Sequence, residues 1–183
     1  MKDLTDEQLM MLINNGDLQV MRSLFDRYHI RIYNFCLKLT HNKAVSEDLT
    51  QETFYRVIKH RKSFNNKSFA AWIFTIARNL CNDHFNKTKL SPLDTNTLEG
   101  NIENTTYYND EEKKETIDHL KSTLNKLNTT DKELIILSRF EKLKYREIAS
   151  IMNISEAAIK TRIHRALHQL RAHYFKSNEN VQL

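Results

Sequence analysis

Residues 145–170 read YREIASIMNISEAAIKTRIHRALHQL. The start of this stretch has the apolar spacing of a short helix, with Ile148 and Ala149 on one face. Asn153 is a residue type that accepts the left-handed conformation in which helices end, and Ser155 is a type that caps the start of the next helix. Two helices joined by such a short turn form a helix-turn-helix, and we therefore expect that motif here.

The second helix of this motif has two chemically different faces. Ile159, Ile163 and Ala166 recur at helical spacing and form an apolar stripe. The other face carries the polar residues Lys160, Thr161, Arg162, His164 and Arg165. Lys and Arg can donate hydrogen bonds to guanine O6 and N7 in the major groove, and Thr can offer a hydroxyl or a methyl contact. An ordinary solvated face is the alternative, but the capped turn favours DNA binding.

The composition of the whole chain favours long helices. Its 183 residues include only 2 glycines and 1 proline, whereas a typical chain has about 7% glycine and about 5% proline. Tight turns and glycine-rich phosphate loops need these residues. The composition therefore argues against β-sandwiches, β-barrels and phosphate loops, and we expect an all-α fold.

The charge is distributed unevenly along the chain. The net charge of +5 separates into +4 for residues 1–87, −5 for residues 88–119 and +6 for residues 120–183. Basic segments attract the phosphates of nucleic acids and release their counterions. Two basic segments around an acidic one favour nucleic-acid binding, although a solvated charged surface is the alternative.

Helical signals divide the chain into two parts. Thr5 and Gln8 predict a capping box in the first part, and Thr130 and Glu133 predict another in the second. The apolar spacing vanishes over residues 88–110, which hold the only proline and the second glycine. We therefore expect two small helical domains, an N-terminal helical bundle and a C-terminal helix-turn-helix, joined by a flexible acidic linker. The expected ranges are 1–87 for the first domain, 88–119 for the linker, 120–176 for the second domain and 177–183 for a tail.

Two cysteines, Cys36 and Cys81, form neither a C-x-x-C pair nor a zinc-finger spacing. We therefore expect no structural zinc and no disulfide framework, but two reduced core residues. Residues 1–7 are too acidic for a signal peptide, and no apolar run approaches the ~20 residues of a membrane helix. These features predict a cytoplasmic protein.

Three stretches of the chain resemble one known family. Residues 46–54, SEDLTQETF, are similar to the signature helix of bacterial RNA polymerase sigma factors. Residues 69–79, FAAWIFTIARN, are similar to the promoter-melting helix of that family, and residues 158–166, AIKTRIHRA, resemble its −35 recognition helix. The order of the motifs and the short, two-domain chain resemble the extracytoplasmic-function (ECF) subgroup.

This resemblance implies a promoter-specificity subunit with no catalytic activity, cofactor or metal of its own. Such a subunit binds core RNA polymerase and promoter DNA. It recognises the −35 element as a duplex, and it melts and captures the −10 element. An anti-sigma factor, often bound to the membrane, usually holds members of the family inactive. The −35 contacts implied here are the five polar residues of the recognition helix.

The resemblance assigns binding of core polymerase to one face of the first motif. The polar stripe of this helix holds Asp48, Gln51, Glu52 and Tyr55. In the family, residues that match the first three dock on the clamp helices of the largest polymerase subunit. An ordinary solvated face is the alternative if the resemblance is ignored. The inward stripe is expected to hold Val45, Leu49, Thr53 and Val57.

The resemblance also assigns −10 DNA binding to the second motif and the loop before it. The residues expected to contact this DNA are Phe64, Asn65, Asn66, Lys67, Ser68, Arg78, Asn79, Asn82 and Asp83. The loop supplies an aromatic ring, amides and a cation, a combination that holds an unstacked base. By resemblance, the loop together with Asn79 and Asp83 captures a flipped base. On the helix that follows, Phe69, Ile73, Ile76 and Leu80 are expected to face inward and Ala71 outward. For Trp72 the core is favoured, and stacking on DNA is the alternative.

Two other functions are open from the sequence. A helix-turn-helix repressor or activator would share the C-terminal motif, but it normally binds a palindrome as a dimer. A metal-dependent nucleic-acid enzyme would use Asp48, Glu52 and Asp83, yet such sites need ligands that converge from several helices. His164 and His168 have the spacing of a metal-ligand pair, but no third ligand is near them in the sequence.

Overall fold

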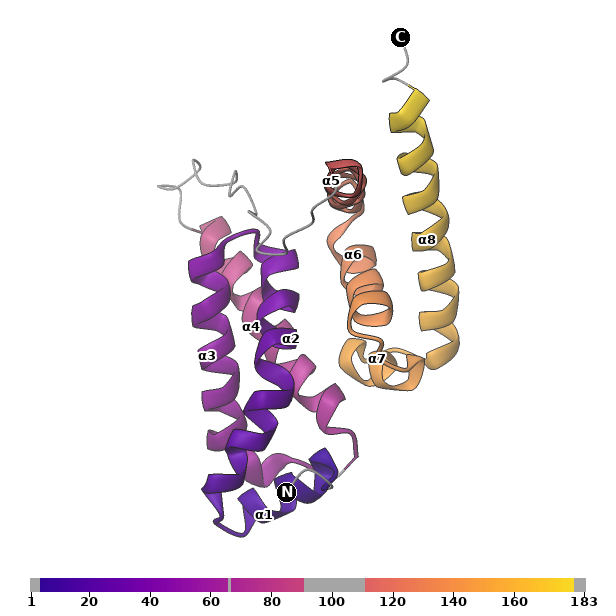
Figure 1. The fold of residues 1–183 in the computed structure, drawn as a ribbon. Coiled ribbons are helices and arrows are strands. Elements are labelled where there is room, and N and C mark those ends of the chain that lie inside the picture. Colours follow the sequence, from indigo (N-terminus) through magenta and orange to yellow (C-terminus); the bar gives the residue numbers. More distant parts are fainter. Residues whose placement is uncertain (1–3, 66, 91–110, 180–183) are drawn as a thin grey trace. The chain divides into compact units, whose positions relative to one another are not determined.

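The computed structural model describes residues 4–65, 67–90 and 111–179. Within these ranges every regular element is a helix, which confirms the expected all-α fold. The chain divides into two compact units, the first built on helices α1 to α4 and the second on α5 to α8 (Figure 1). None of the helices in the described ranges is long and apolar enough to cross a membrane.

The amino-terminal unit is a helical bundle. Its elements are α1 (Asp6–Asn14), the 3-10 turn η1 (Leu18–Val20), α2 (Met21–Thr40), α3 (Lys43–Lys59), the 3-10 turn η2 (Arg61–Ser63) and α4 (Phe69–Leu90). Figure 1 shows α2, α3 and α4 alongside one another, with α1 across one end. Their inward faces fully bury the large side chains Leu24, Ile32, Phe35, Phe69 and Phe74. Burial of this apolar surface drives folding and leaves the polar faces of α3 and α4 in solvent.

The first helix begins as the sequence predicts. The Thr5 N–H donates to Gln8 Oε1 at 2.8 Å, and the Gln8 N–H donates to Thr5 Oγ1 at 3.2 Å. This is the expected capping box. After α1, Gly16 adopts a φ of +102°, a backbone conformation that favours glycine. Asp17 then caps turn η1, where its Oδ1 accepts the Gln19 N–H at 3.2 Å.

The two cysteines meet in the core of this unit. Cys36 on α2 and Cys81 on α4 are fully buried and form no disulfide, which confirms their expected role as reduced core residues. The Cys81 thiol donates to Cys36 Sγ at a sulfur–sulfur distance of 3.8 Å. Sequence spacing gave no sign of this proximity, because it arises from the packing of α2 against α4.

The carboxyl-terminal unit holds the helix-turn-helix. Its elements are α5 (Glu111–Asn125), α6 (Thr129–Ile135), the π-helical turn η3 (Ile136–Phe140), α7 (Tyr145–Met152) and α8 (Glu156–Glu179). The expected capping box of Thr130 and Glu133 does not form. Instead α6 begins earlier, and Asn128 Oδ1 accepts the Asp131 N–H at 2.9 Å. Asn is at least as good an N-cap as Thr. The helix therefore starts after Asn128, the earlier of the two cap residues, and not after Thr130.

Helices enter both ends of the range expected for the linker. α4 extends to Leu90, and α5 begins at Glu111. The Glu and Lys residues at the start of α5 have good helix propensity but no apolar period, so the sequence pattern did not reveal them as helical. Residues 91–110, in the middle of the expected linker, and residues 180–183, in the expected tail, lie outside the described residues.

A buried lysine opposes the stability of the carboxyl-terminal unit. Lys132 on α6 is only 8% exposed, and its Nζ donates to Asn125 Oδ1 at 2.8 Å. Burial disfavours the charged ammonium and lowers the pKa of Lys132 from 10.5 to about 8. The folded chain therefore holds this proton less tightly than the unfolded chain does.

We expect the free energy of unfolding to rise as the pH increases from about 8 to 10.5, because the unfolded chain then keeps a proton at Lys132 that the folded chain has lost. One proton contributes at most about 1.4 kcal/mol per pH unit. The substitution Lys132→Met should remove this slope and raise the stability at neutral pH. Urea denaturation of both proteins at neutral and alkaline pH measures the effect. An equal pH dependence in the two proteins would contradict it.

Candidate nucleic-acid interface

The turn between α7 and α8 is capped on both sides. Asn153 adopts the left-handed conformation with φ 54° and ψ 44°, and the Ile154 N–H donates to the Ala149 carbonyl oxygen at 3.2 Å. Ser155 Oγ accepts the Ala158 N–H at 3.2 Å at the start of α8. These contacts confirm the expected helix-turn-helix and set the direction in which α8 leaves the turn.

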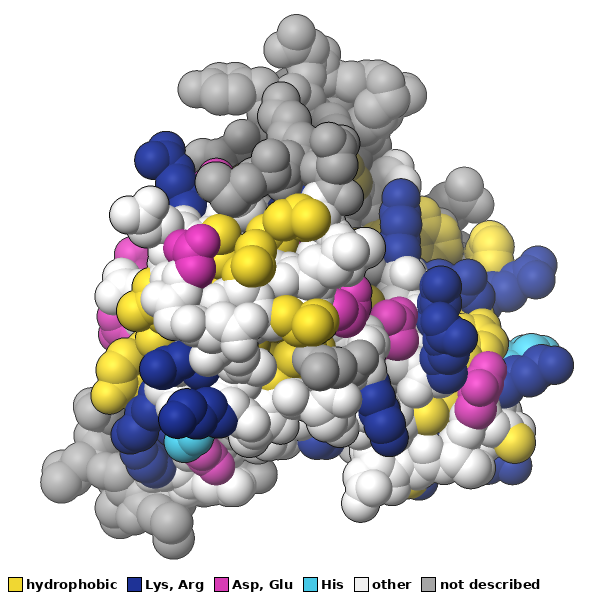
Figure 2. Space-filling view, turned by 90° about the horizontal axis from the view of Figure 1, so that it is seen from below, with side chains coloured by type: hydrophobic (Ala, Val, Ile, Leu, Met, Phe, Trp, Pro, Cys, Tyr) yellow, Lys and Arg dark blue, Asp and Glu magenta, His cyan; other side chains and the backbone are white. Residues whose placement is uncertain are grey.

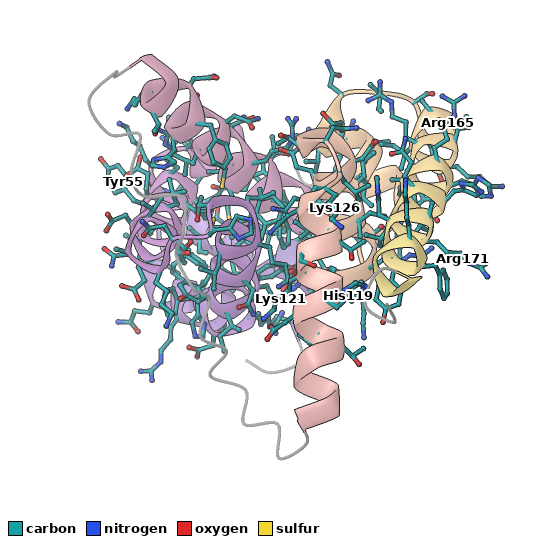
Figure 3. The ribbon with its side chains drawn as sticks, turned by 90° about the horizontal axis from the view of Figure 1, so that it is seen from above. Tyr55, His119, Lys121, Lys126, Arg165 and Arg171 are labelled. Atoms are coloured by element: carbon teal, nitrogen blue, oxygen red, sulfur yellow. The ribbon has the colours of Figure 1, made fainter. Side chains whose placement is uncertain are left out.

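The two faces of α8 are those that the sequence predicts. Ile159, Ile163 and Ala166 are at most 1% exposed. The polar residues Lys160, Thr161, Arg162, His164 and Arg165 are all exposed. Figure 2 shows Lys and Arg side chains, in dark blue, on the surface of this unit at the right of the view, and Figure 3 shows Arg165 and Arg171 pointing outward from α8. The helix thus presents a row of hydrogen-bond donors to solvent.

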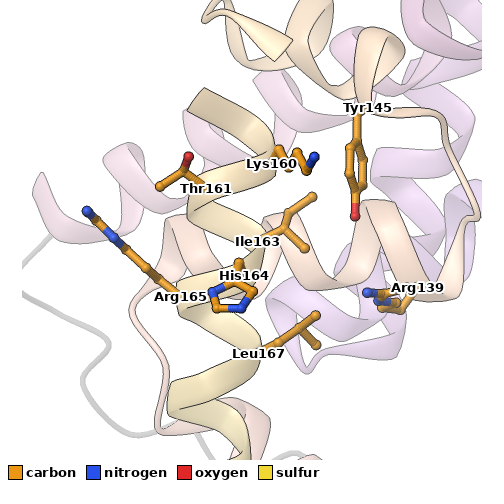
Figure 4. A pocket seen from close by; sticks show the side chains of 8 residues that line it. All are labelled: Arg139, Tyr145, Lys160, Thr161, Ile163, His164, Arg165 and Leu167. Carbon is orange, nitrogen blue, oxygen red and sulfur yellow. The ribbon is translucent and has the colours of Figure 1, made fainter. Parts of the chain in front are cut away.

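A pocket of about 410 Å³ lies beside this polar face. Its lining residues are Arg139, Tyr145, Lys160, Thr161, Ile163, His164, Arg165 and Leu167 (Figure 4). In Figure 4 the Lys160 side chain points toward the Tyr145 ring. Sequence reasoning missed Arg139 and Tyr145, because they lie on η3 and α7 and reach α8 only through the fold. They add a guanidinium and a phenol to the polar surface.

The outward stripe of α3 is polar, as expected. Asp48, Gln51 and Tyr55 are exposed, and Figure 3 shows Tyr55 pointing away from the helix. Glu52 is half-buried, and its Oε1 accepts a hydrogen bond from Arg56 Nε at 2.8 Å. The side chains of this stripe stand on a regular helix and present carboxylates, an amide and a phenol on one surface.

The inward stripe of α3 differs from the expectation. Thr53 and Val57 are buried, but Val45 and Leu49 are only half-buried. The other residues buried on this helix are Ser46, Thr50 and Phe54. The hydroxyls of Ser46, Thr50 and Thr53 donate to backbone carbonyl oxygens one turn back, at 2.6 to 2.7 Å. Because local hydrogen bonds satisfy these hydroxyl groups, Ser and Thr side chains are buried on this helix. A pattern based on apolar residues does not identify such positions.

One expected DNA contact, Phe64, belongs to the core. It is 5% exposed, and its ring centroid lies 5.3 Å from that of Trp72 and 6.1 Å from that of Phe69. The expectation that its ring is offered to an unstacked base is therefore corrected. Phe64 packs against the aromatic residues at the start of α4. Burial of its ring in this cluster is more favourable than exposure to water.

The rest of the loop before α4 is polar. Asn65 and Lys67 are exposed, and Asn65 Oδ1 accepts the Lys67 N–H at 3.3 Å. Ser68 is half-buried, and its Oγ accepts the Ala71 N–H at 3.2 Å, so this residue caps α4. Asn66 lies outside the described residues. The described part of the loop thus offers an amide and an ammonium to solvent.

The polar residues of α4 that were expected near DNA differ in exposure. Asn79 and Asp83 are exposed, whereas Arg78 and Asn82 are half-buried. Trp72 is half-buried and packs against Phe64 and Phe69, so its ring contacts the aromatic cluster and also keeps an exposed part. These side chains follow the loop along one helix, so the loop and the exposed polar groups of α4 share the same unit.

The inward face of α4 is wider than expected. Phe69, Ile73 and Leu80 are buried, as expected, but Ala71 is buried too and Ile76 is only half-buried. The cause is that α4 packs against α1, α2 and α3, so that more than one stripe of the helix meets a neighbour.

No group of three His, Cys, Asp or Glu side chains that could hold a metal ion is found among the described residues. The carboxylates considered for a metal-dependent enzyme lie on two helices, with Asp48 and Glu52 on α3 and Asp83 on α4. His164 is an exposed residue that lines the pocket on α8, and His168 is also exposed.

Comparison with known proteins matches both units to one family. The family "Sigma-70 region 2" matches residues 24–90, and the family "Sigma-70, region 4" matches residues 118–170. The ECF RNA polymerase sigma factor SigM of Bacillus subtilis is 31% identical over 151 residues, which cover 82% of this chain and 93% of SigM.

Two solved structures have a similar fold. CnrH, in complex with the cytosolic domain of CnrY, has a TM-score of 0.70 at 22% identity, covering 91% of this chain and 95% of CnrH. RpoE of Bartonella quintana, in complex with the anti-sigma factor NepR, has a TM-score of 0.70 at 24% identity, covering 83% of this chain and 94% of RpoE. At these identities the likeness supports the all-α fold.

The left-handed turn of the helix-turn-helix leads to a prediction about stability. Asn153→Ala should lower the free energy of unfolding by about 1–2 kcal/mol, because alanine lacks the side-chain hydrogen bonds that help asparagine to accept a left-handed φ. Asn153→Gly is the matched control and should be nearly neutral, since glycine adopts this conformation readily. Urea denaturation of the three proteins measures the difference. Equal stabilities of the Ala and Gly variants would show that the turn does not constrain this unit.

Proposed function

The chain belongs to the ECF sigma factors and is a promoter-specificity subunit of RNA polymerase; on this premise we propose which of its surfaces bind the polymerase, the −10 element and the −35 element. The observation that carries the assignment is the division of the chain. The residues that match region 2 and region 4 lie in separate compact units, and each unit has exposed polar helix faces.

Core polymerase binds the outward stripe of α3 in this proposal. Asp48 and Glu52 supply carboxylates, Gln51 an amide and Tyr55 a phenol on one rigid helix. An ion pair with Arg56 holds the Glu52 carboxylate in place within the stripe, with 2.8 Å between Arg56 Nε and Glu52 Oε1. A surface of this kind suits a basic and polar partner helix, because charged and polar groups across an interface are arranged to be complementary.

The −10 element binds the loop before α4 and the exposed polar groups of that helix. Asn65, Lys67, Asn79 and Asp83 are exposed and combine amides, a cation and a carboxylate. Amides read base edges as both donors and acceptors, a carboxylate accepts from base amino groups, and a lysine neutralises phosphate. Phe64 supports the loop from the core in place of stacking on a base.

The −35 element binds the polar face of α8. Lys160 and Arg165 are exposed hydrogen-bond donors on this face. Both line the pocket, together with Arg139 and Tyr145. The Thr161 hydroxyl donates its proton to the Ala157 carbonyl oxygen at 3.1 Å, so Thr161 offers DNA its methyl group, which suits a thymine methyl, and a hydroxyl oxygen that can accept a hydrogen bond. In this proposal Arg139 and Tyr145 contact phosphates, and such contacts fix the register of α8 on the duplex.

The remaining parts of the proposal concern the whole chain. In the sequence, residues 91–110 separate α4 from α5, and in this proposal they join the two units while each binds its own promoter element. The chain acts in the cytoplasm and carries no catalytic activity of its own, so core polymerase performs the chemistry. RpoE of Bartonella quintana binds an anti-sigma factor, and we include an anti-sigma factor among the partners of this chain.

Run-off transcription tests the proposed function. Core polymerase together with this chain should produce transcripts of defined length from a cognate promoter, and neither component alone should do so. A chain that does not bind core polymerase contradicts the proposal. Asp48→Lys should abolish core binding through charge reversal at an exposed position, while binding of −35 duplex by α8 is retained.

Recognition of the −35 element makes a second prediction. Lys160→Ala or Arg165→Ala should weaken binding of a cognate −35 duplex by about 1–3 kcal/mol, with a smaller effect on a scrambled duplex, if the side chain contacts a base edge. Arg171→Ala removes the same charge from an exposed position of α8 outside the pocket and is the matched control. Fluorescence anisotropy with both duplexes measures the effects. An equal loss on every duplex assigns the residue to phosphate contact.

A further inference from the structure

A hydrogen bond joins the first helix of the chain to the start of α4. The backbone N–H of Phe69, the first residue of α4, donates to Glu7 Oε1 at 3.1 Å, across 62 residues of sequence. Glu7 lies in the first turn of α1, and its side chain is half-buried. A carboxylate from a distant helix therefore caps the helix that follows the −10 loop.

This contact satisfies a backbone group that the helix cannot satisfy itself. The first N–H groups of a helix have no partner within it, and a negative charge near them is favourable. Ser68 Oγ accepts the Ala71 N–H at 3.2 Å, and Glu7 accepts the Phe69 N–H. A local cap and a long-range cap thus hold the same helical turn.

Aromatic packing connects Phe69 to the loop before α4. The Phe69 ring is fully buried, with its centroid 5.1 Å from that of Tyr28 and 6.1 Å from that of Phe64. Phe64 opens the loop, and Ser68 ends it. The packing of Phe64 on Phe69 and the cap at Ser68 therefore hold the two ends of the loop near the start of α4, and the exposed residues Asn65 and Lys67 lie between those ends.

The helix that carries Glu7 is itself anchored. Arg27 Nη1 on α2 donates to Asp6 Oδ1 at 2.6 Å and to the Leu4 carbonyl oxygen at 3.0 Å. The Tyr28 hydroxyl donates to Asp6 Oδ2. Asp6 therefore ties α1 to α2, whereas the neighbouring Glu7 ties α1 to α4. Two adjacent carboxylates have separable roles.

We propose that Glu7 is a positioning residue for −10 recognition: it holds the start of α4 and with it the loop that captures the single strand. The inference rests on the proposed function of that loop. Glu7 touches no DNA in this scheme and acts through the Phe69 backbone. Removing its carboxylate should allow the first turn of α4 to fray and lower the fraction of chains in which the loop is ready to bind.

The test compares Glu7→Ala, Glu7→Gln and Asp6→Asn in the full chain bound to core polymerase. The probes are a non-template-strand −10 oligonucleotide from a promoter that supports run-off transcription, and a −35 duplex. Glu7→Ala should bind the single strand about tenfold more weakly, equivalent to about 1.4 kcal/mol, with unchanged affinity for the −35 duplex and for core polymerase. Glu7→Gln should restore most of the affinity, because its amide oxygen can accept the same N–H.

Asp6→Asn is the matched control for a loss of stability. It weakens the contacts of α1 with α2 while leaving the Glu7 carboxylate in place, so it should lower the melting temperature and reduce single-strand binding, measured well below that temperature, much less than Glu7→Ala does. Single-strand binding by Glu7→Ala that equals the wild type, or that falls no further than in Asp6→Asn, overturns the role of Glu7. A Gln variant as weak as the Ala variant does the same.

The two proposals fail in different ways. A wild-type holoenzyme that does not bind the −10 strand contradicts the function proposed for the loop. Hydrogen exchange then still tests the restraint itself, because Glu7→Ala should speed exchange of the Phe69 amide relative to Asp6→Asn. An unchanged exchange rate overturns the positioning role without reference to DNA.

Discussion

The ends of the helices are the constraint on which this structure depends. Helix ends leave backbone N–H and carbonyl groups without partners, and glycine, the usual residue for ending a helix, is almost absent from the chain. In the part of the chain that the structure describes, His41, Lys142 and Asn153 take positive φ values of 54° to 56° without being glycine. Side-chain acceptors start the helices, and those seen in the described residues include Thr5, Asn42, Ser68, Asn128 and Ser155.

These caps bear on function because each one sets where a functional helix begins. Ser155 starts α8, Asn42 starts α3, and Ser68 together with Glu7 starts α4, which are the helices proposed to bind the −35 element, the polymerase and the −10 element. Each cap satisfies backbone N–H groups that the helix cannot satisfy by itself and so limits fraying of its first turn. Burial of the apolar stripes decides which polar groups face solvent, and the caps keep the first turns of those helices formed.

Sequence reasoning succeeded where a helix packs on one side. α8 buries a single apolar stripe, so the spacing of Ile159, Ile163 and Ala166 identified both its core face and its polar face. The prediction of buried residues failed where a helix packs against several neighbours, and where a local hydrogen bond allows a hydroxyl side chain to be buried. α4 packs against three helices and buries Ala71, and α3 buries Ser46 through hydrogen bonds to its own backbone.

The sequence by itself determined the helical class of the fold, the capped helix-turn-helix and the family, because these depend on composition and on residues within a few positions of one another. Only the packing of the helices places Phe64 in the core, brings Arg139 and Tyr145 into the pocket beside the polar face of α8, and lets Glu7 cap α4. Such contacts join residues far apart in the chain. They follow from how whole helices pack, and no local periodicity encodes that packing.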